Sequence, residues 1–143
     1  MNGDHARQED GPLSTSSICR EVESDSWAVR AAAGRRLAGM TDQEEIRPLL
    51  LQLMMDPRDT GVTQETAEAL LERKDLLGLC LVLMALSRAE AWWTIDQLSG
   101  EVYGYQDMMI ADDRAAQFTE QLVTLTTDED AGVQEEALRM LGE

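Results

Sequence analysis

The chain has 143 residues, long enough for one domain with its own hydrophobic core. It carries 28 Asp and Glu against 12 Lys and Arg, a formal net charge of −16. A field of that sign repels nucleic-acid phosphates and anionic lipid, so we expect neither a nucleic-acid nor a membrane partner. A protein partner, basic in the simplest case, is favoured, although the acidity can also serve solubility alone.

The N-terminal residues and the two cysteines indicate in which cellular compartment the protein is expected. Residues 1–11 are polar without periodicity and lack the apolar core of a signal peptide, so we expect a disordered tail followed by one domain over 12–143. Cys19 and Cys80 lie in apolar helical patterns and are expected to be free thiols. No stretch is long enough to cross a bilayer, so the default compartment is the cytoplasm.

Few aromatic residues are available, so the core must be built mainly from Leu, Ala, Met and Val, which favours helices. In chain order, apolar periodicity and capping residues predict helices at about 13–22, 26–40, 43–55, 60–73, 76–86, 92–98, 111–126 and 130–142. Gly100 and Gly104 predict an irregular connection at 99–107. The eight helices form four hairpins, at about 12–40, 43–74, 75–104 and 110–142.

Two of these helices carry specific expectations about burial. The helix at 26–40 should turn Arg30, Arg35 and Arg36 away from its buried stripe or to its edge. The stripe itself consists of Val29, Ala32, Ala33 and Leu37. The run at 76–86 is apolar on every side, so it should lie at the centre of the molecule.

One pattern occurs three times: a capping residue, Val three positions later, a small residue four after the Val, and Leu eight after it. The copies are Ser26-Val29-Ala33-Leu37, Asp59-Val62-Thr66-Leu70 and Asp130-Val133-Ala137-Leu141. The first two valines are 33 residues apart and the last two 71, about two repeats with one degenerate copy between. Such regular recurrence indicates a helical repeat protein.

The copies resemble HEAT repeats, in which the second helix of a hairpin follows an Asp and reads Val, often Arg, then small residues, then Leu. Asp25, Val29, Arg30, Ala33 and Leu37 fit this description. So do Leu53, Asp56, Val62, Ala67, Ala69 and Leu70, and Leu125, Asp128, Val133, Ala137 and Leu141. The resemblance implies an all-α, right-handed α-α superhelix, a short solenoid of about four hairpins and eight helices. It also implies a protein-binding surface.

The residues offer little for catalysis. His5 is the only histidine and lies in the tail, so histidine-based catalytic and metal sites are not expected. The acidic run from Asp128 lacks a calcium loop's ligands, since Val133 and Arg139 stand at its sixth and twelfth positions. We therefore predict no catalytic residues, metal or cofactor, and a protein that is not an enzyme.

A candidate partner-binding surface combines aromatic and acidic residues. Exposed Trp and Tyr among carboxylates are typical interface anchors. The candidates are Trp92, Trp93, Asp96, Tyr103, Tyr105, Glu65, Glu68 and Glu72. Alternatively, the four aromatic residues only fill the irregular third hairpin. Trp27 is expected to be a core or staple residue.

We therefore predict a non-catalytic adaptor or scaffold that presents an acidic surface to a protein partner. An alternative within the binding class is an immunity or antitoxin-like inhibitor of a basic toxin enzyme. Less favoured are a DNA glycosylase-like HEAT protein, which would need a basic cleft, and a small-molecule or pigment-handling module with a hydrophobic gap around Gly78 and Trp92.

Overall fold

The computed structural model describes residues 15–142, which form eight α-helices, two short 3₁₀ helices and no β-strand. The α-helices are α2 (Thr15–Val22), α3 (Trp27–Leu37), α4 (Arg47–Met54), α5 (Thr60–Leu71), α6 (Leu76–Arg88), α7 (Trp92–Ala111), α8 (Ala115–Leu125) and α9 (Ala131–Met140). The 3₁₀ helices are η1 (Ala38–Met40) and η2 (Glu44–Ile46). The predicted all-α class and the eight helices are confirmed over this range, and the predicted tail at 1–11 lies outside it.

Helix α7 is continuous over 20 residues, so the prediction of a helix ending at residue 98 and an irregular connection at 99–107 is wrong. Its buried side chains follow one another at spacings of three and four residues. They are Thr94, Leu98, Val102, Tyr105 and Met109. Burial along this stripe outweighs the low helix propensity of Gly100 and Gly104, which both lie on the exposed face.

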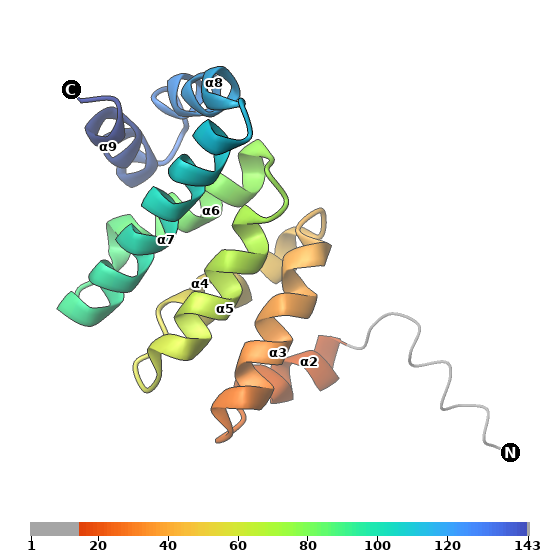
Figure 1. Ribbon diagram of the computed structural model, residues 1–143. Helices are drawn as coiled ribbons and strands as arrows, with labels where there is room; N and C mark the ends of the chain where they lie inside the picture. The colour runs from red at the N-terminus through yellow and green to blue at the C-terminus, as the bar shows by residue number, and fades with distance from the viewer. Residues whose placement is uncertain (1–14, 143) are drawn as a thin grey trace, which may run out of the picture.

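Three helices lie side by side as one layer. In Figure 1, α3, α5 and α7 run in the same direction, with their N-terminal ends at the same end of the layer. Helix α5 packs between α3 and α7, and α4 packs against α6 behind this layer. The second helices of the first three hairpins therefore contact one another in succession, α3 with α5 and α5 with α7.

The last hairpin departs from this order. Helix α9 packs against α6, whereas α8 contacts α7. Helices α6 and α9 approach each other closely at Gly132, where an added Cβ would overlap the Ser87 hydroxyl. The Arg88 guanidinium also binds the Asp130 carboxylate at 2.8 Å. As a result, the flank of α7 that faces away from α5 is not covered by α9 along its first turns (Figure 1).

Helix α6 lies at the centre, as its apolar sequence predicted. It contacts α4, α5, α7, α8 and α9, and most of its side chains are buried. A Cβ added at Gly78 would overlap the Leu70 carbonyl oxygen, so α5 and α6 touch at that point. None of the helices described is both long and apolar enough to cross a membrane.

The three predicted N-caps are confirmed. Ser26 accepts a hydrogen bond from the Val29 amide at 3.3 Å, and Asp130 accepts one from the Val133 amide at 3.0 Å. Asp59 accepts from the Gly61 amide at 2.7 Å. These side chains satisfy backbone donors that the helices cannot, which fixes where α3, α5 and α9 begin.

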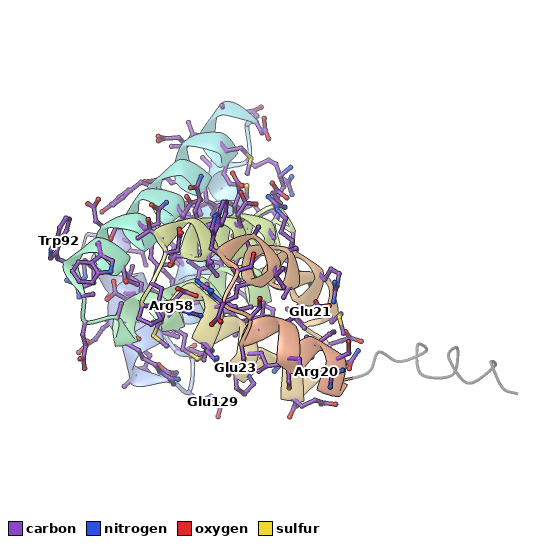
Figure 2. All side chains as sticks on the ribbon, turned by 90° about the horizontal axis from the view of Figure 1, so that it is seen from below. Arg20, Glu21, Glu23, Arg58, Trp92 and Glu129 are labelled. Atoms are coloured by element: carbon purple, nitrogen blue, oxygen red, sulfur yellow. The ribbon has the colours of Figure 1, made fainter. Side chains whose placement is uncertain are left out.

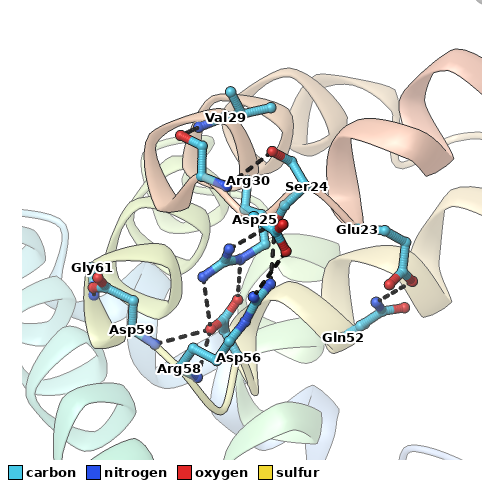
Figure 3. A network of polar contacts seen from close by, with 11 residues as sticks. Glu23, Ser24, Asp25, Val29, Arg30, Gln52, Asp56, Arg58, Asp59 and Gly61 are labelled. Carbon is cyan, nitrogen blue, oxygen red and sulfur yellow. Dashed lines mark hydrogen bonds and ion pairs between the residues drawn. The ribbon is translucent and has the colours of Figure 1, made fainter.

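Arg30, predicted to point away from the buried stripe or to lie at its edge, is itself buried, with only 3% of the residue exposed. Its Nε donates to Asp56 Oδ2 at 2.7 Å and its Nη1 donates to the Ser24 carbonyl at 2.8 Å (Figure 3). At this position α3 packs against the α4–α5 turn. The Asp56 carboxylate of that turn supplies the negative charge that allows arginine to be buried. Val29 and Ala32, predicted to be buried, are exposed instead.

Candidate interaction surface

A row of carboxylates runs along the outer face of α5. Glu65, Glu68 and Glu72 follow at spacings of three and four residues, so they share one face. Arg35 of α3 reaches all three, at 2.6 Å from Glu65, 3.1 Å from Glu68 and 3.7 Å from Glu72. One guanidinium among three carboxylates leaves this row negative.

Glu101 adds a fourth carboxylate from the neighbouring helix α7. Burial raises the pKa of its carboxyl group, and the negative charges of Glu68 and Glu65 raise it further. A hydrogen bond from Gln97 at 3.0 Å acts in the opposite direction. Glu101 therefore faces the α5 row closely enough for the like charges to disfavour its ionisation.

A groove of about 290 Å³ separates α5 from α7 at this point. Its lining residues are Glu68, Leu71, Glu72, Glu101, Gly104, Tyr105 and Met108. Leu71 and Tyr105 are buried and form its apolar wall, whereas the three carboxylates are more exposed. The groove thus combines an apolar interior with a negatively charged mouth.

The exposed aromatic residues lie nearer the beginning of α7. Trp92 is 72% exposed, Trp93 44% and Tyr103 54%, and the two indole rings meet edge to face with centroids 5.8 Å apart. Figure 2 shows Trp92 projecting from the N-terminal end of its helix. Asp96 is exposed one turn later. At 100° per residue, Trp92, Asp96 and Tyr103 lie about 140° to 180° around α7 from Glu101, so they form an apolar, partly aromatic surface on the side of α7 turned away from the acidic groove.

Tyr105 does not belong to this exposed set. It is 4% exposed, its ring packs edge to face on Phe118, and its hydroxyl donates to Gln121 Oε1 at 2.8 Å. Burial raises the pKa of its phenol. The prediction of an exposed anchor at Tyr105 is therefore wrong, because helix α8 covers this side of α7.

The predicted surface residues are brought onto one layer but not to one point. Trp92 and Glu101 are nine residues apart on α7, about 13 Å along the helix axis. Trp27, expected to be a core or staple residue, is half exposed at the start of α3, and its ring packs near Gly61 of α5. Both outer helices of the layer, α3 and α7, thus have tryptophan as their first residue.

Arg35, Glu101, Gly104 and Met108 were missed by sequence reasoning as members of this surface. Arg35 was recognised only as a base outside the buried stripe, Glu101 and Gly104 fall in the stretch 99–107 interpreted as irregular, and Met108 lies directly after it. The signal that identifies them is the spacing of Leu98, Val102, Tyr105 and Met109, which continues a helix through both glycines. Once α7 is continuous, Glu101, Gly104 and Met108 lie along one side of this helix, where they line the groove beside α5.

A second, larger groove lies on the opposite side, between α4, α6 and the α8–α9 turn. Its volume is about 530 Å³, and Leu51, Leu77, Leu81 and Met84 supply apolar lining. Asp128 approaches Cys80 Sγ at 3.8 Å. Burial and this carboxylate raise the pKa of the Cys80 thiol to about 12, so the group is protonated and unreactive at neutral pH.

Within residues 15–142, no group of three or more His, Cys, Asp or Glu side chains is placed to hold a metal ion. The gap suggested around Gly78 is filled, because Gly78 packs against the Leu70 carbonyl. Trp92 lies at the exposed end of α7. Cys19 and Cys80 are free thiols, as predicted.

Comparison of the chain with protein-family models, with curated proteins and with solved structures found no match.

Proposed function

We propose that this protein is a non-catalytic interaction module that presents an acidic face to a basic protein partner. The observation that carries the proposal is the convergence of Glu65, Glu68 and Glu72 of α5 with Glu101 of α7, with Arg35 as the cation in contact. Like charges held this close favour a cationic ligand, because its arrival relieves their repulsion.

The proposal includes a HEAT-like, right-handed superhelix as the scaffold. The lateral packing of α3, α5 and α7 supports it, as do the recurring N-caps. The hairpin of α8 and α9 is then a modified end unit, because its helices contact α7 and α6 in exchanged order. Two free thiols agree with a cytoplasmic setting.

In this proposal Trp92, Trp93 and Tyr103 extend the interface around α7, to the side away from the carboxylates. Their large exposed rings have few rotatable bonds, so burying them against a partner removes much apolar surface at a small entropic cost. Asp96 lies on the same side of α7 as Trp92 and Tyr103, and its carboxylate adds to the negative field. In this arrangement the acidic groove gives charge specificity and the aromatic residues give apolar contact.

The test is affinity capture from the organism's own lysate, followed by mass spectrometry and measurement of salt dependence. We expect the captured proteins to be basic and to dissociate as ionic strength rises, because surface charge attraction is screened. The quadruple variant Trp92→Ala, Trp93→Ala, Tyr103→Ala and Glu68→Gln should lose this capture while retaining its helical circular dichroism spectrum.

A matched control changes exposed residues on the last hairpin instead. The control carries Val123→Ala, Leu138→Ala and Glu129→Gln, which also remove exposed apolar groups and one negative charge. It should capture the same proteins as the unaltered chain. Equal capture by the quadruple variant would reject the proposed face.

A further inference from the structure

The helices of the layer formed by α3, α5 and α7 share one pattern when residues are counted from their N-caps. These caps are Ser26 of α3, Asp59 of α5 and Ala91 of α7. The third, seventh and eleventh residues after the cap are buried in both α5 and α7. They are Val62, Thr66 and Leu70 in α5, and Thr94, Leu98 and Val102 in α7. Residues at equal distances from the caps therefore point in equivalent directions within the layer.

Trp27 shows how one helix of this layer contacts the next. It is the first residue after the α3 cap, and its ring lies against Gly61 of α5, where an added Cβ would meet two ring carbons at 3.4 Å. Gly34 and Ala38, eight and twelve residues after the same cap, share this side of the helix and also lie beside α5. The first, eighth and twelfth positions of α3 thus face the following helix.

The equivalent side of α7 faces no further helix of the layer among residues 15–142, because α9 packs against α6 instead. The first, eighth and twelfth residues after the α7 cap are Trp92, Ser99 and Tyr103. Trp92 and Tyr103 are both exposed, and Ser99 is partly exposed. Trp92, which occupies the position of Trp27, therefore projects to where the next helix of the layer would begin (Figure 2).

At the opposite edge of the layer, α3 turns a flank of mostly small side chains outward (Figure 1). Ala28, Ala32 and Arg36 follow at spacings of four residues, and all three are exposed. Ala28 is the second residue after its cap, as Gly61 is in α5. At 3.4 Å a Cβ and an indole ring are in van der Waals contact, so Ala28 can accept an indole as Gly61 accepts Trp27.

The two edges of the layer also differ in charge. Residues 15–40 carry four arginines and three carboxylates, whereas residues 89–142 carry two arginines and twelve carboxylates. Arg36 pairs with Glu21 but remains 53% exposed on the α3 flank, and Asp96 is exposed on the α7 flank. Two α7 edges would repel each other. An α7 edge facing an α3 edge instead combines complementary charges.

We propose that the uncovered flank of α7 binds the outer flank of α3 of a second copy of this chain, so that copies join head to tail and continue the layer. Trp92 lies on Ala28 of the second copy, and the Tyr103 ring lies beside its Arg36 guanidinium, which stacks on aromatic faces. Because the two surfaces differ, each added copy leaves one of them free at either end.

This inference goes beyond the proposed function. The carboxylate row of α5 is not part of the contact and stays open in every copy. The aromatic residues of α7 are covered in all copies except the last one of a chain, which keeps them available for another partner.

The first measurement is sedimentation velocity of the full chain over a concentration series. About 0.3 M salt screens the repulsion between copies that each carry a net charge of −16. We expect the weight-average mass to rise beyond that of two copies between about 5 µM and about 500 µM, as mass action requires of an open head-to-tail contact. A chain that stays monomeric over this range would overturn the proposal.

Two variants each block one end. The α7-end variant carries Trp92→Ala and Tyr103→Ala, and the α3-end variant carries Ala28→Glu and Ala32→Glu. All four residues are exposed, and alanine and glutamate are good helix formers, so both variants should keep the circular dichroism spectrum of the unaltered chain. We expect each variant alone to be monomeric, because it cannot form the contact with a copy of itself.

An equimolar mixture of the two variants tests the head-to-tail arrangement. The α3-end variant has an intact α7 flank and the α7-end variant has an intact α3 flank, so a single contact remains possible. We expect a dimer of one copy of each variant and nothing larger. A monomeric mixture, or a dimer formed by either variant alone, would overturn the arrangement.

Two matched controls alter the last hairpin instead. Val123→Ala with Leu138→Ala removes exposed apolar groups, and Ala115→Glu with Ala116→Glu adds two carboxylates at exposed alanines of α8. Both controls should assemble like the unaltered chain. Loss of assembly in either control would mean a general sensitivity to surface changes and would overturn the assignment to the two flanks.

The α3-end variant also separates this inference from the proposed function. Its carboxylate row and its α7 aromatic residues are unchanged, so as a monomer it should still capture basic proteins from lysate. Capture without assembly of the unaltered chain would overturn the head-to-tail contact and leave the proposed function standing. Assembly without capture would do the reverse.

Discussion

Arg30 of α3 and Asp56 of the α4–α5 turn form an ion pair in which both side chains are almost fully buried. The Arg30 Nε lies 2.7 Å from Asp56 Oδ2, while the backbone amides of Arg58 and Asp59 donate to Asp56 Oδ1 at 2.9 Å and 3.0 Å. With Arg30 Nη2, which donates to Oδ1 at 3.4 Å, four donors from three residues satisfy one carboxylate (Figure 3). The pair connects the first two hairpins through charges that water cannot reach.

Arg30→Ala should destabilise the protein by about 3–5 kcal/mol, because it leaves the Asp56 carboxylate buried without its cation. Arg36→Ala is the matched control, since Arg36 pairs with Glu21 at the exposed surface. Its loss should cost less than about 1 kcal/mol. The measurement is urea unfolding followed by circular dichroism, and equal costs for the two variants would contradict the role assigned to burial.

Stability should fall in acid because of Asp56. Burial opposes its ionisation, but hydrogen bonds from Arg30 and from the Arg58 and Asp59 amides outweigh burial and lower the pKa of the carboxyl. A carboxyl with a lowered folded-state pKa stabilises the fold above its unfolded value of about 3.9, and this contribution disappears as pH falls through the lowered pKa. Melting temperatures between pH 6 and pH 2 should therefore fall more steeply for the unaltered chain than for Asp56→Asn. The exposed variant Asp42→Asn should follow the unaltered chain.

Glu101 should show the opposite sign. Its pKa is raised, chiefly by burial, so the folded state holds a proton more tightly than the unfolded chain and loses stability as pH rises through the glutamate range. Glu101→Gln should therefore raise the melting temperature at pH 7. It should bring little or no gain at pH 3, where the glutamate is protonated in both states. A gain of equal size at both pH values would point to a cause other than charge.

Gly34 and Thr66 should be strongly coupled. A Cβ at Gly34 would overlap the Thr66 hydroxyl oxygen, which is buried and has no hydrogen-bond partner among the described residues. Gly34→Ala alone should cost about 1–3 kcal/mol through overpacking between α3 and α5. Adding Thr66→Ala should recover part of that loss by vacating the space. A double-mutant cycle by urea unfolding measures the coupling, and strict additivity would contradict the contact.

Cys80 should resist alkylation. With a pKa of about 12, roughly one thiol in ten thousand is ionised at pH 8, against a substantial fraction for an ordinary cysteine in an unfolded chain. Iodoacetamide should label Cys80 at least about a hundredfold more slowly in the native protein than in urea. Cys19, which is more exposed, should react first. Mass spectrometry of the labelled peptides distinguishes the two sites.

Local signals in the sequence predicted the helices well where capping and periodicity agree. Ser26, Asp59 and Asp130 are N-caps because each carries a side-chain oxygen at the position where the backbone needs an acceptor. The apolar run of α6 likewise predicted its central position, although Leu76 is 38% exposed and Leu77, Leu81 and Met84 line the larger groove. These features depend on neighbouring residues only, so the sequence contains all the information that they need.

The failures concern contacts between residues distant in the chain. Arg30 was interpreted as outward-facing because its partner Asp56 lies 26 residues away. Gly100 and Gly104 were interpreted as breakers because the cover that holds α7 helical comes from α5, α6 and α8. Glu101 entered the candidate site only once α7 was continuous. The groove itself depends on how α5 and α7 pack, which no local pattern specifies.

The Arg30–Asp56 pair also has a consequence for how the protein opens. Arg30 Nη1 and Arg58 Nη2 both donate to the Ser24 carbonyl, so the α2–α3 turn is attached to the same cluster. Opening of the first hairpin alone would expose these charges to solvent or leave them without their partners. The first two hairpins should therefore exchange their slowest amide protons as one cooperative unit.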